Sequence, residues 1–437
     1  MSPLGARESP PLGLILPFFL VAPAGLVAAG VMLMLAGRDS LTAVNTPELL
    51  AATHAAVLGW LCISIMGAVF QLGPVLFGGR LLSAGLVRAQ LVVQVAGVAV
   101  MVAAFGAWRT EALAMGGLLT ALSLVLFVVN AACAVRWFSR GSLVRHYLSV
   151  SLVFLLATGT LGLSYAMSLN HGWFPLTFGR IAAHAHLGLA GFLAIVVMGV
   201  SYQLVPMFQL TPHAEPRFGK VVLPWMAIAA IVFAAVMWTN PGPELRVLAA
   251  AALGGGAVLW IADMAAVIRR RAKRAFDIQG RATIVSLVFL ATAVAAGIAA
   301  ASGKPEALAV HHQRLQLSYA FLAIGGWAGT TVLGNSFKIV PFLVWNGRFR
   351  ELAGKTPVPT LAQLLNPRLA YATLWCLSAG VTVGAVAAAA GWLPGLRMSG
   401  LLFAGAGCLQ FATNLLVAVR RPARGAAAAL PPRRIPT

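Results

Sequence analysis

The stretch HAAVLGWLCISIMGAVFQLGPVLF, residues 54–77, is an unbroken run without a charged side chain, and it begins with a histidine. A helix needs about 20 apolar residues to cross the hydrocarbon core of a bilayer. The run therefore predicts a membrane-spanning helix with one ionisable residue, His54, near one end. An ionisable side chain within a span is costly to bury and indicates a functional role.

The whole chain has the same character as this stretch. Of its 437 residues 60% are apolar and 9% are charged, whereas a soluble domain has roughly a quarter charged residues. This composition predicts an all-α polytopic membrane protein in contact with the lipid bilayer. Division at charge and Pro/Gly clusters gives twelve spans: 13–36, 49–78, 83–107, 112–136, 147–168, 181–208, 218–239, 246–267, 283–302, 313–345, 369–391 and 398–420.

The Lys and Arg residues lie mostly on one side of this arrangement. Of 31 in the chain, 23 fall at the two termini or in the loops that follow even-numbered spans. Positively charged loops stay in the cytoplasm, so we expect both termini there, in a bacterial-type cytoplasmic membrane. Residues 421–437 are expected to be a basic, disordered cytoplasmic tail. The opposite side has seven: Arg38, Arg109, Arg180, Arg246, Lys304, Arg314 and Arg397. The basic excess thus reflects topology, and we expect no nucleic-acid partner.

The opening stretch occurs three times. HLGLAGFLAIVVMGVSYQLVPMFQ, residues 186–209, and FLAIGGWAGTTVLGNSFKIVPFLV, residues 321–344, align with it without a gap, at starts 132 and 135 residues apart. The aligned sets are His54, His186 and Phe321; Gly59, Gly191 and Gly326; Gly67, Gly199 and Gly334; Gln71, Gln203 and Lys338; and Pro74, Pro206 and Pro341. We therefore expect one transmembrane domain, residues 1–420, built from four-span repeats at about 13–136, 147–267 and 283–420.

The aligned histidines suggest a cofactor. Two neutral imidazoles that face each other inside a helix bundle are the usual axial pair of a six-coordinate b-type haem. His54 and His186 are expected at similar depth near the outer surface, and they are the primary candidate ligands of the haem iron. The outward Arg38, Arg180 and Arg314 are candidate partners of the haem propionates.

A second haem is a further expectation. His184 lies two positions before His186, so on a helix the two side chains point roughly 200° apart and into different cavities. His184 could ligate a second haem, with His312 or with an open coordination position opposite. An open position would bind a diatomic gas such as O2 or NO. His311 and His312 open the tenth span on the same side.

THAAVLGWLCISIMGAVFQLGPVLFGG, residues 53–79, and AHAHLGLAGF, residues 183–192, resemble helices of the haem–copper oxidase superfamily. The resemblance is to its catalytic subunit, namely cytochrome c oxidase subunit I and the large subunit of nitric oxide reductases. It implies twelve helices in three pseudo-threefold-related four-helix arcs and cytoplasmic termini. It also implies a haem ligand at His54, and an H-x-H pair that gives one histidine to each haem.

The chain departs from this family in two places. In the family the H-x-H pair lies on the tenth helix, whereas here it lies on the sixth span, and the tenth has Tyr319 and Phe321 in register. The family's copper ligands include a histidine pair after the seventh helix, but VMWTNPGPELR, residues 236–246, contains no histidine. Copper is therefore doubtful.

Four functions remain open at this point, the last of them a non-catalytic assembly or regulatory membrane protein. The preferred one is a haem-binding membrane redox protein that passes electrons from a quinol or a periplasmic donor and could bind O2 or NO near the outer face. The first alternative is an active terminal oxidase or NO reductase whose metal site uses His311, His312 and His184. The second is a cofactor-free transporter or channel. Whether the protein is an enzyme is left open, and no catalytic residue is assigned.

Overall fold

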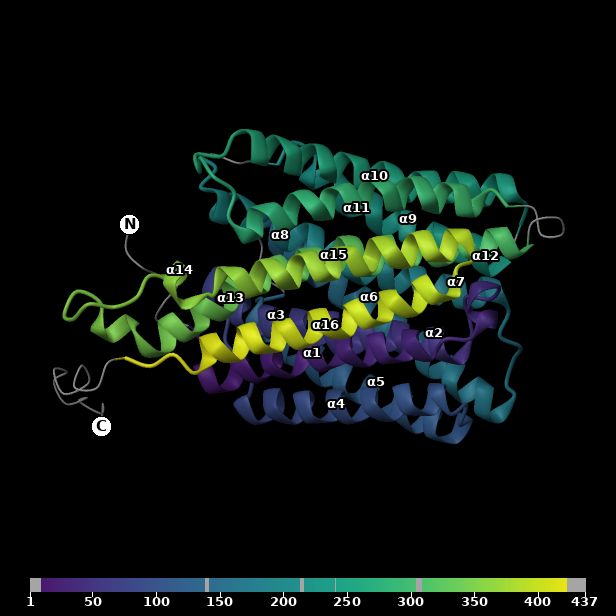
Figure 1. Cartoon of the computed structure of the whole chain (residues 1–437), viewed down its shortest axis with the longest axis horizontal. Coiled ribbons are helices and arrows are strands. Elements are labelled where there is room, and N and C mark those ends of the chain that lie inside the picture. Colours follow the sequence, from purple (N-terminus) through teal and green to yellow (C-terminus); the bar gives the residue numbers. More distant parts are fainter. Residues whose placement is uncertain (1–8, 138–140, 213–215, 240, 304–308, 423–437) are drawn as a thin grey trace.

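The protein is a bundle of long helices that run side by side (Figure 1). The structure is a computed structural model, and it describes residues 9–137, 141–212, 216–239, 241–303 and 309–422. Twelve helices in these ranges are long and apolar enough to cross a membrane, and these ranges contain no strand. The predicted all-α polytopic fold is confirmed. Of the predicted tail, 421–437, all but the first two residues lie outside the described ranges.

The observed crossings match the predicted spans to within a few residues. In chain order they are α1 (Leu12–Leu35); α2, η3 and α3 (Pro47–His54, Ala55–Cys62, Ile63–Phe77); α4 (Ala84–Gly106); α5 (Thr110–Ala134); α6 (Leu143–His171); α7, η4 and α8 (Phe178–His186, Leu187–Ala194, Ile195–Gln209); α9 (Gly219–Thr239); α10 (Pro243–Arg269); α11 (Ile278–Ala301); α12, η5 and α13 (Ala309–Ala320, Phe321–Gly329, Thr330–Arg348); α15 (Pro367–Ala390); and α16 (Leu393–Ala418). The short helices η2 (Arg38–Leu41), η6 (Arg350–Leu352) and α14 (Leu361–Leu364) lie in loops.

Local sequence signals set several helix ends. Pro47 and Pro367 occupy the first turn of α2 and α15, where a missing N–H costs nothing. Asn366 caps α15 by accepting hydrogen bonds from two backbone amides, as N-cap residues do. Gly78 follows α3 with φ of 64°, a left-handed conformation that glycine adopts without strain. These signals divide a nearly continuous apolar sequence into separate crossings.

The three repeated segments form the centre of the bundle. In the crossings that contain them, 72%, 61% and 72% of the most apolar window is buried, against at most 56% in the other nine crossings of the described chain. The segments also touch one another, since η5 contacts both η3 and η4, and α13 contacts both α3 and α8. The remaining helices surround this centre, so side chains of the repeats face protein rather than lipid.

Each repeated segment contains a π-helix at the same place. The π-helical segments η3 and η4 begin directly after His54 and His186, and η5 begins at Phe321, the residue aligned with these histidines. A π-helical turn is rare and occurs frequently at functional sites. The repeat detected in the sequence therefore extends to an unusual backbone feature.

One end of the bundle carries the histidines. We call it the distal end; it is the end at which α1 stops at Leu35 and α16 begins at Leu393, on the right in Figure 1. The loop helix η2, helix α7 and the start of α12 also lie there (Figure 1). Every segment that bears a candidate haem ligand therefore meets at one end of the molecule.

Candidate functional site

A cavity of about 460 Å³ lies among the central and surrounding helices. Most of its wall is apolar, and all four candidate ligands, His54, His184, His186 and His312, line it. Cavities of this size that are apolar with a few polar groups are typical cofactor and ligand sites. The structure thus brings together residues that are up to 258 positions apart in the sequence.

His54 is held by its own helix. It is the last residue of α2, and its Nδ1 lies 2.8 Å from the carbonyl oxygen of Leu50. A carbonyl oxygen only accepts, so Nδ1 donates the proton and Nε2 keeps its lone pair. The Phe105 ring lies beside the imidazole, with ring centroids 4.8 Å apart. This hydrogen bond to a backbone carbonyl is the usual way in which a metal-binding histidine is oriented.

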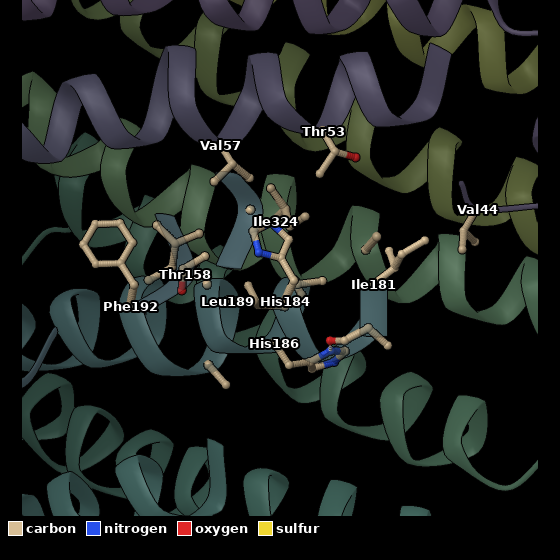
Figure 2. A pocket seen from close by; sticks show the side chains of 18 of the residues that line it. Val44, Thr53, Val57, Thr158, Ile181, His184, His186, Leu189, Phe192 and Ile324 are labelled. Carbon is tan, nitrogen blue, oxygen red and sulfur yellow. Dashed lines mark hydrogen bonds between the residues drawn. The ribbon is translucent and has the colours of Figure 1, made fainter. Parts of the chain in front are cut away.

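The imidazole that faces His54 belongs to His184. The two ring centroids are 6.5 Å apart, and the ring planes differ by 15°. Figure 2 shows His184 on the side of Thr53 and Val57, which are neighbours of His54, and His186 on the other side of their shared helix. The pairing expected from the repeat, His54 with His186, therefore differs from the observed arrangement. We call the space around His54 and His184 the first compartment.

The His184 ring is enclosed by neighbouring residues. Its Nδ1 is buried and has no hydrogen-bond partner among the described residues. Gly162 packs directly against the ring, and a Cβ atom at that position would lie 2.8 Å from Cε1 of His184. The Tyr165 ring lies on another side at 5.7 Å between centroids. Gly162 and Tyr165 therefore enclose the His184 ring from two sides.

His186 lies in a second group of side chains. Its Nδ1 is 2.9 Å from the carbonyl oxygen of Ala182, so its Nε2 also keeps a lone pair. Its ring lies 4.3 Å from that of Phe233 and 5.7 Å from that of Tyr319, the latter at 4° between planes. We call the space around His186 and Tyr319 the second compartment.

The two compartments are built in the same way. Tyr319 lies two positions before Phe321, just as His184 lies two positions before His186. Each compartment therefore pairs the first residue of one repeat with the residue two positions before the next repeat. The third pair of this kind is Phe321, the first residue of the third repeat, and Ala52, two positions before the first repeat. Phe321 packs against Phe403 at 5.9 Å between ring centroids, and Ala52 is buried. Two of the three equivalent positions thus carry polar rings, and the third is filled by apolar groups.

One cation lies in the distal wall of the cavity, and it is not among the residues predicted to bind a cofactor. Arg246 is the one Lys or Arg among the lining residues that the structure describes, and its Nη2 donates to the carbonyl oxygen of Gly303 at 3.0 Å. His312 also lines the wall, whereas the neighbouring His311 is exposed and outside it. The sequence could have indicated Arg246, because it is one of only seven Lys and Arg residues on the predicted outer side.

The three arginines expected to meet propionates lie elsewhere. Arg38 is exposed in η2. Arg180 donates from Nη1 to the carbonyl oxygen of Pro175 at 2.7 Å and lies over the Trp238 ring. Arg314 packs its guanidinium against Gly391. None of these three side chains lines the cavity.

Other polar residues of the spans have local partners far from the cavity. Asp263 accepts hydrogen bonds from Tyr202 Oη and from the Phe218 backbone N–H, both at 3.0 Å. Gln71 donates to Ser9, and Lys338 forms an ion pair with Asp277. In the described part of the chain no three His, Cys, Asp or Glu side chains gather as a metal-ion site.

Comparison with known proteins adds no family. A scan against protein-family models finds no match to this sequence, and a search of curated proteins finds none either. The resemblance to haem–copper oxidases stays a prediction from the quoted motifs.

Proposed function

We propose that this protein is a haem-binding membrane redox protein in which His54 and His184 would hold one b-type haem. The observation that carries the proposal is the facing pair of imidazoles in the first compartment, 6.5 Å apart and nearly parallel. Metal–imidazole bonds are about 2 Å long, so two imidazoles on opposite sides of one metal ion place their ring centres roughly 6 Å apart. The observed separation fits this requirement.

The surroundings of the pair also fit a flat, apolar macrocycle. Gly117, Gly159 and Gly162 line the cavity, and Gly162 packs directly against the His184 ring. The Leu50 carbonyl oxygen accepts a hydrogen bond from Nδ1 of His54, so the lone pair on Nε2 is free to bind a metal ion. When bound, a haem supplies one-electron chemistry by changing between ferric and ferrous iron.

Two histidine ligands would leave no coordination site for a gas. In this arrangement His54 and His184 would hold the iron, and the apolar walls of the first compartment would exclude water. We therefore propose electron transfer as the function of this compartment, rather than binding of O2 or NO.

The second compartment does not offer an equivalent axial pair. His186 and Tyr319 have ring centroids 5.7 Å apart. A phenol oxygen lies farther from its ring centre than an imidazole nitrogen does, so a metal ion between these rings needs more than the roughly 6 Å that two imidazoles need. We propose one haem per chain and no ligand role for His186.

The proposed orientation places the haem near the outer face. It is supported by the distribution of Lys and Arg, of which Arg38, Arg246 and Arg397 belong to the sparse set at the distal end. We also propose that the three repeats form the three four-helix arcs of the oxidase-like architecture. The support is the recurrence of a π-helix at the same place in each repeat.

An optical spectrum tests the function. Protein purified after expression with sufficient haem supply is expected to show sharp α bands on reduction, with no change on adding carbon monoxide, and one iron per chain. A carbon monoxide shift would point to an open position and to gas binding. A colourless protein would refute the proposal and favour a cofactor-free transporter.

A further inference from the structure

The turn between α10 and α11 carries a dense group of cations. Residues 269–274 read RRRAKR, so five of these six residues are basic, and Asp277 is the one acid between residues 264 and 281. The segment begins at the last residue of α10 and lies at the end of the bundle opposite the histidines, on the left in Figure 1. We call residues 269–274 the basic turn. The haem proposal makes no use of it.

Two of the five cations of the basic turn are engaged by neighbouring side chains. Lys273 forms an ion pair with Asp277, to which Lys338 is also paired. The guanidinium of Arg271 lies 4.0 Å from the centre of the Phe276 ring. The other three side chains are exposed: Arg269, Arg270 and Arg274. In the described part of the chain no carboxylate forms an ion pair with any of these three, so their charge is available to an anionic partner.

Exposed apolar side chains lie beside the basic turn. The backbone N–H of Ala272 donates to the carbonyl oxygen of Leu210 at 3.4 Å, which joins the middle of the turn to the residue that follows α8. Leu210 is 63% exposed, and Met207, in the last turn of α8, is 44% exposed. A surface that presents cations and apolar side chains next to each other fits a partner with an anionic head and an apolar body.

The length of α10 places the basic turn at the level of the lipid headgroups. The helix is long and apolar enough to cross a membrane, and its middle residue is Gly256. Arg269 follows thirteen residues later, about 20 Å along the helix axis. Half of the hydrocarbon core of a bilayer is about 15 Å thick. A helix centred in the core therefore carries Arg269 past the acyl chains, where clustered cations next to a span attract anionic lipids.

We propose that the basic turn is a binding site for the headgroup of an anionic phospholipid of the surrounding membrane. Arg269, Arg270 and Arg274 donate hydrogen bonds to the phosphate oxygens, which guanidinium groups bind well. An acyl chain lies along Met207 and Leu210. A zwitterionic lipid has the same acyl chains but carries its own cation, so the site selects for net negative charge. The site is at the other end of the bundle from the proposed haem and does not depend on it.

The test is native mass spectrometry of the purified full chain in detergent, titrated with dioleoyl phosphatidylglycerol or with dioleoyl phosphatidylcholine. The two lipids have the same acyl chains and differ in net charge. Wild type is expected to bind phosphatidylglycerol at least tenfold more tightly than phosphatidylcholine. A triple variant with Arg269→Gln, Arg270→Gln and Arg274→Gln is expected to lose this preference, because each basic residue near an anionic lipid strengthens binding roughly fivefold. Its affinity for phosphatidylcholine is expected to equal that of wild type.

A matched control loses the same charge from three exposed positions elsewhere at the same end of the bundle: Arg80→Gln, Arg88→Gln and Arg368→Gln. The control is expected to keep the wild-type preference for phosphatidylglycerol. An equal loss in the control and in the triple variant would overturn the site and assign the preference to net charge alone. Equal affinity of wild type for both lipids would also overturn it. Displacement of phosphatidylglycerol by millimolar inorganic phosphate would overturn the lipid assignment in favour of a free-anion site.

Discussion

The two histidines at the ends of α2 and α7 have the same local structure but different partners. Nδ1 of His54 and of His186 donates to the carbonyl oxygen four residues earlier. Each bond joins a histidine to the residue four positions earlier on the same helix. The two histidines before the π-helical segments are therefore oriented in the same way. What each imidazole faces is decided by other helices, and there the side chains are those of His184 and Tyr319.

Gly162 is predicted to be required for haem binding. A side chain there would collide with the His184 ring, so Gly162→Leu is expected to reduce haem content severalfold while the helical fold remains. The haem-to-protein ratio and far-ultraviolet circular dichroism of purified protein measure the two effects. Gly13→Leu is the control, because a Cβ there meets no atom within 4 Å. Full haem content in Gly162→Leu would speak against a ligand role for His184.

Asp277 is predicted to stabilise the fold only while it is charged. Burial raises its pKa, but hydrogen bonds from Lys273 and Lys338 outweigh burial, and the pKa of Asp277 is lowered. Both Nζ atoms lie 2.5 Å from its Oδ2. A carboxyl whose pKa is lower in the folded state contributes stability above its unfolded pKa of about 3.9, and loses it as the pH falls through the folded pKa.

Asp277→Asn keeps the cap on the Gly280 amide and removes the charge. It is expected to destabilise the protein by about 1 kcal/mol at neutral pH, because the pair is partly exposed. Thermal unfolding in detergent at neutral pH and at about pH 3 measures the difference. The difference in stability between variant and wild type should be smaller at the acid pH; an equal difference at both values would rule out the charge as the cause.

At the scale of elements, the crossings could be predicted from the sequence, and the π-helices could not. Span positions follow from apolar length and charge, and those quantities place α3 and α8 to within a few residues. The π-helical segments are apolar, as are the helices α3 and α8 that follow them. Their extra residue per turn arises from packing between helices, which no single segment encodes. The residue alignment nevertheless indicates where these segments begin, since η3 and η4 start one residue after the aligned histidine and η5 starts at the aligned phenylalanine.

The contact between α1 and α16 is predicted to depend on small residues. A Cβ at Gly400 would lie 2.5 Å from the carbonyl oxygen of Gly30, and glycine allows such close approach of membrane helices. Gly400→Leu is therefore expected to destabilise the protein by about 2 kcal/mol and to lower its melting temperature in detergent. Gly13→Leu on α1 serves as the control here too. An unchanged melting temperature in Gly400→Leu would contradict this packing.

At the scale of the molecule, the histidines predicted as ligands line one cavity, but the sequence did not indicate which rings lie next to each other. All four histidines predicted as ligands line one cavity, because the repeat placed them at similar depth. Depth does not say which rings face each other, since that depends on how the three repeats are rotated about one another. For the same reason the sequence did not indicate that Tyr319 lies beside His186 or that Arg246 lines the cavity.

The orientation of the bundle is predicted from charge. In a variant with all four cysteines replaced by alanine, Arg38→Cys at the distal end should react with a membrane-impermeant thiol reagent in intact cells, because that end faces outward. Arg420→Cys should react only after the cells are opened. Both sites are exposed. The reverse pattern would put the proposed haem near the inner face.

The ligand pair is the central claim, and reduced-minus-oxidised spectra of single variants test it most directly. His54→Ala and His184→Ala are predicted to lose the low-spin α bands, because each removes one of the two proposed haem ligands. His186→Ala is predicted to keep them, because His186 faces Tyr319 rather than the first compartment. Loss of the bands in His186→Ala together with their retention in His184→Ala would contradict the account and assign the haem to His54 and His186.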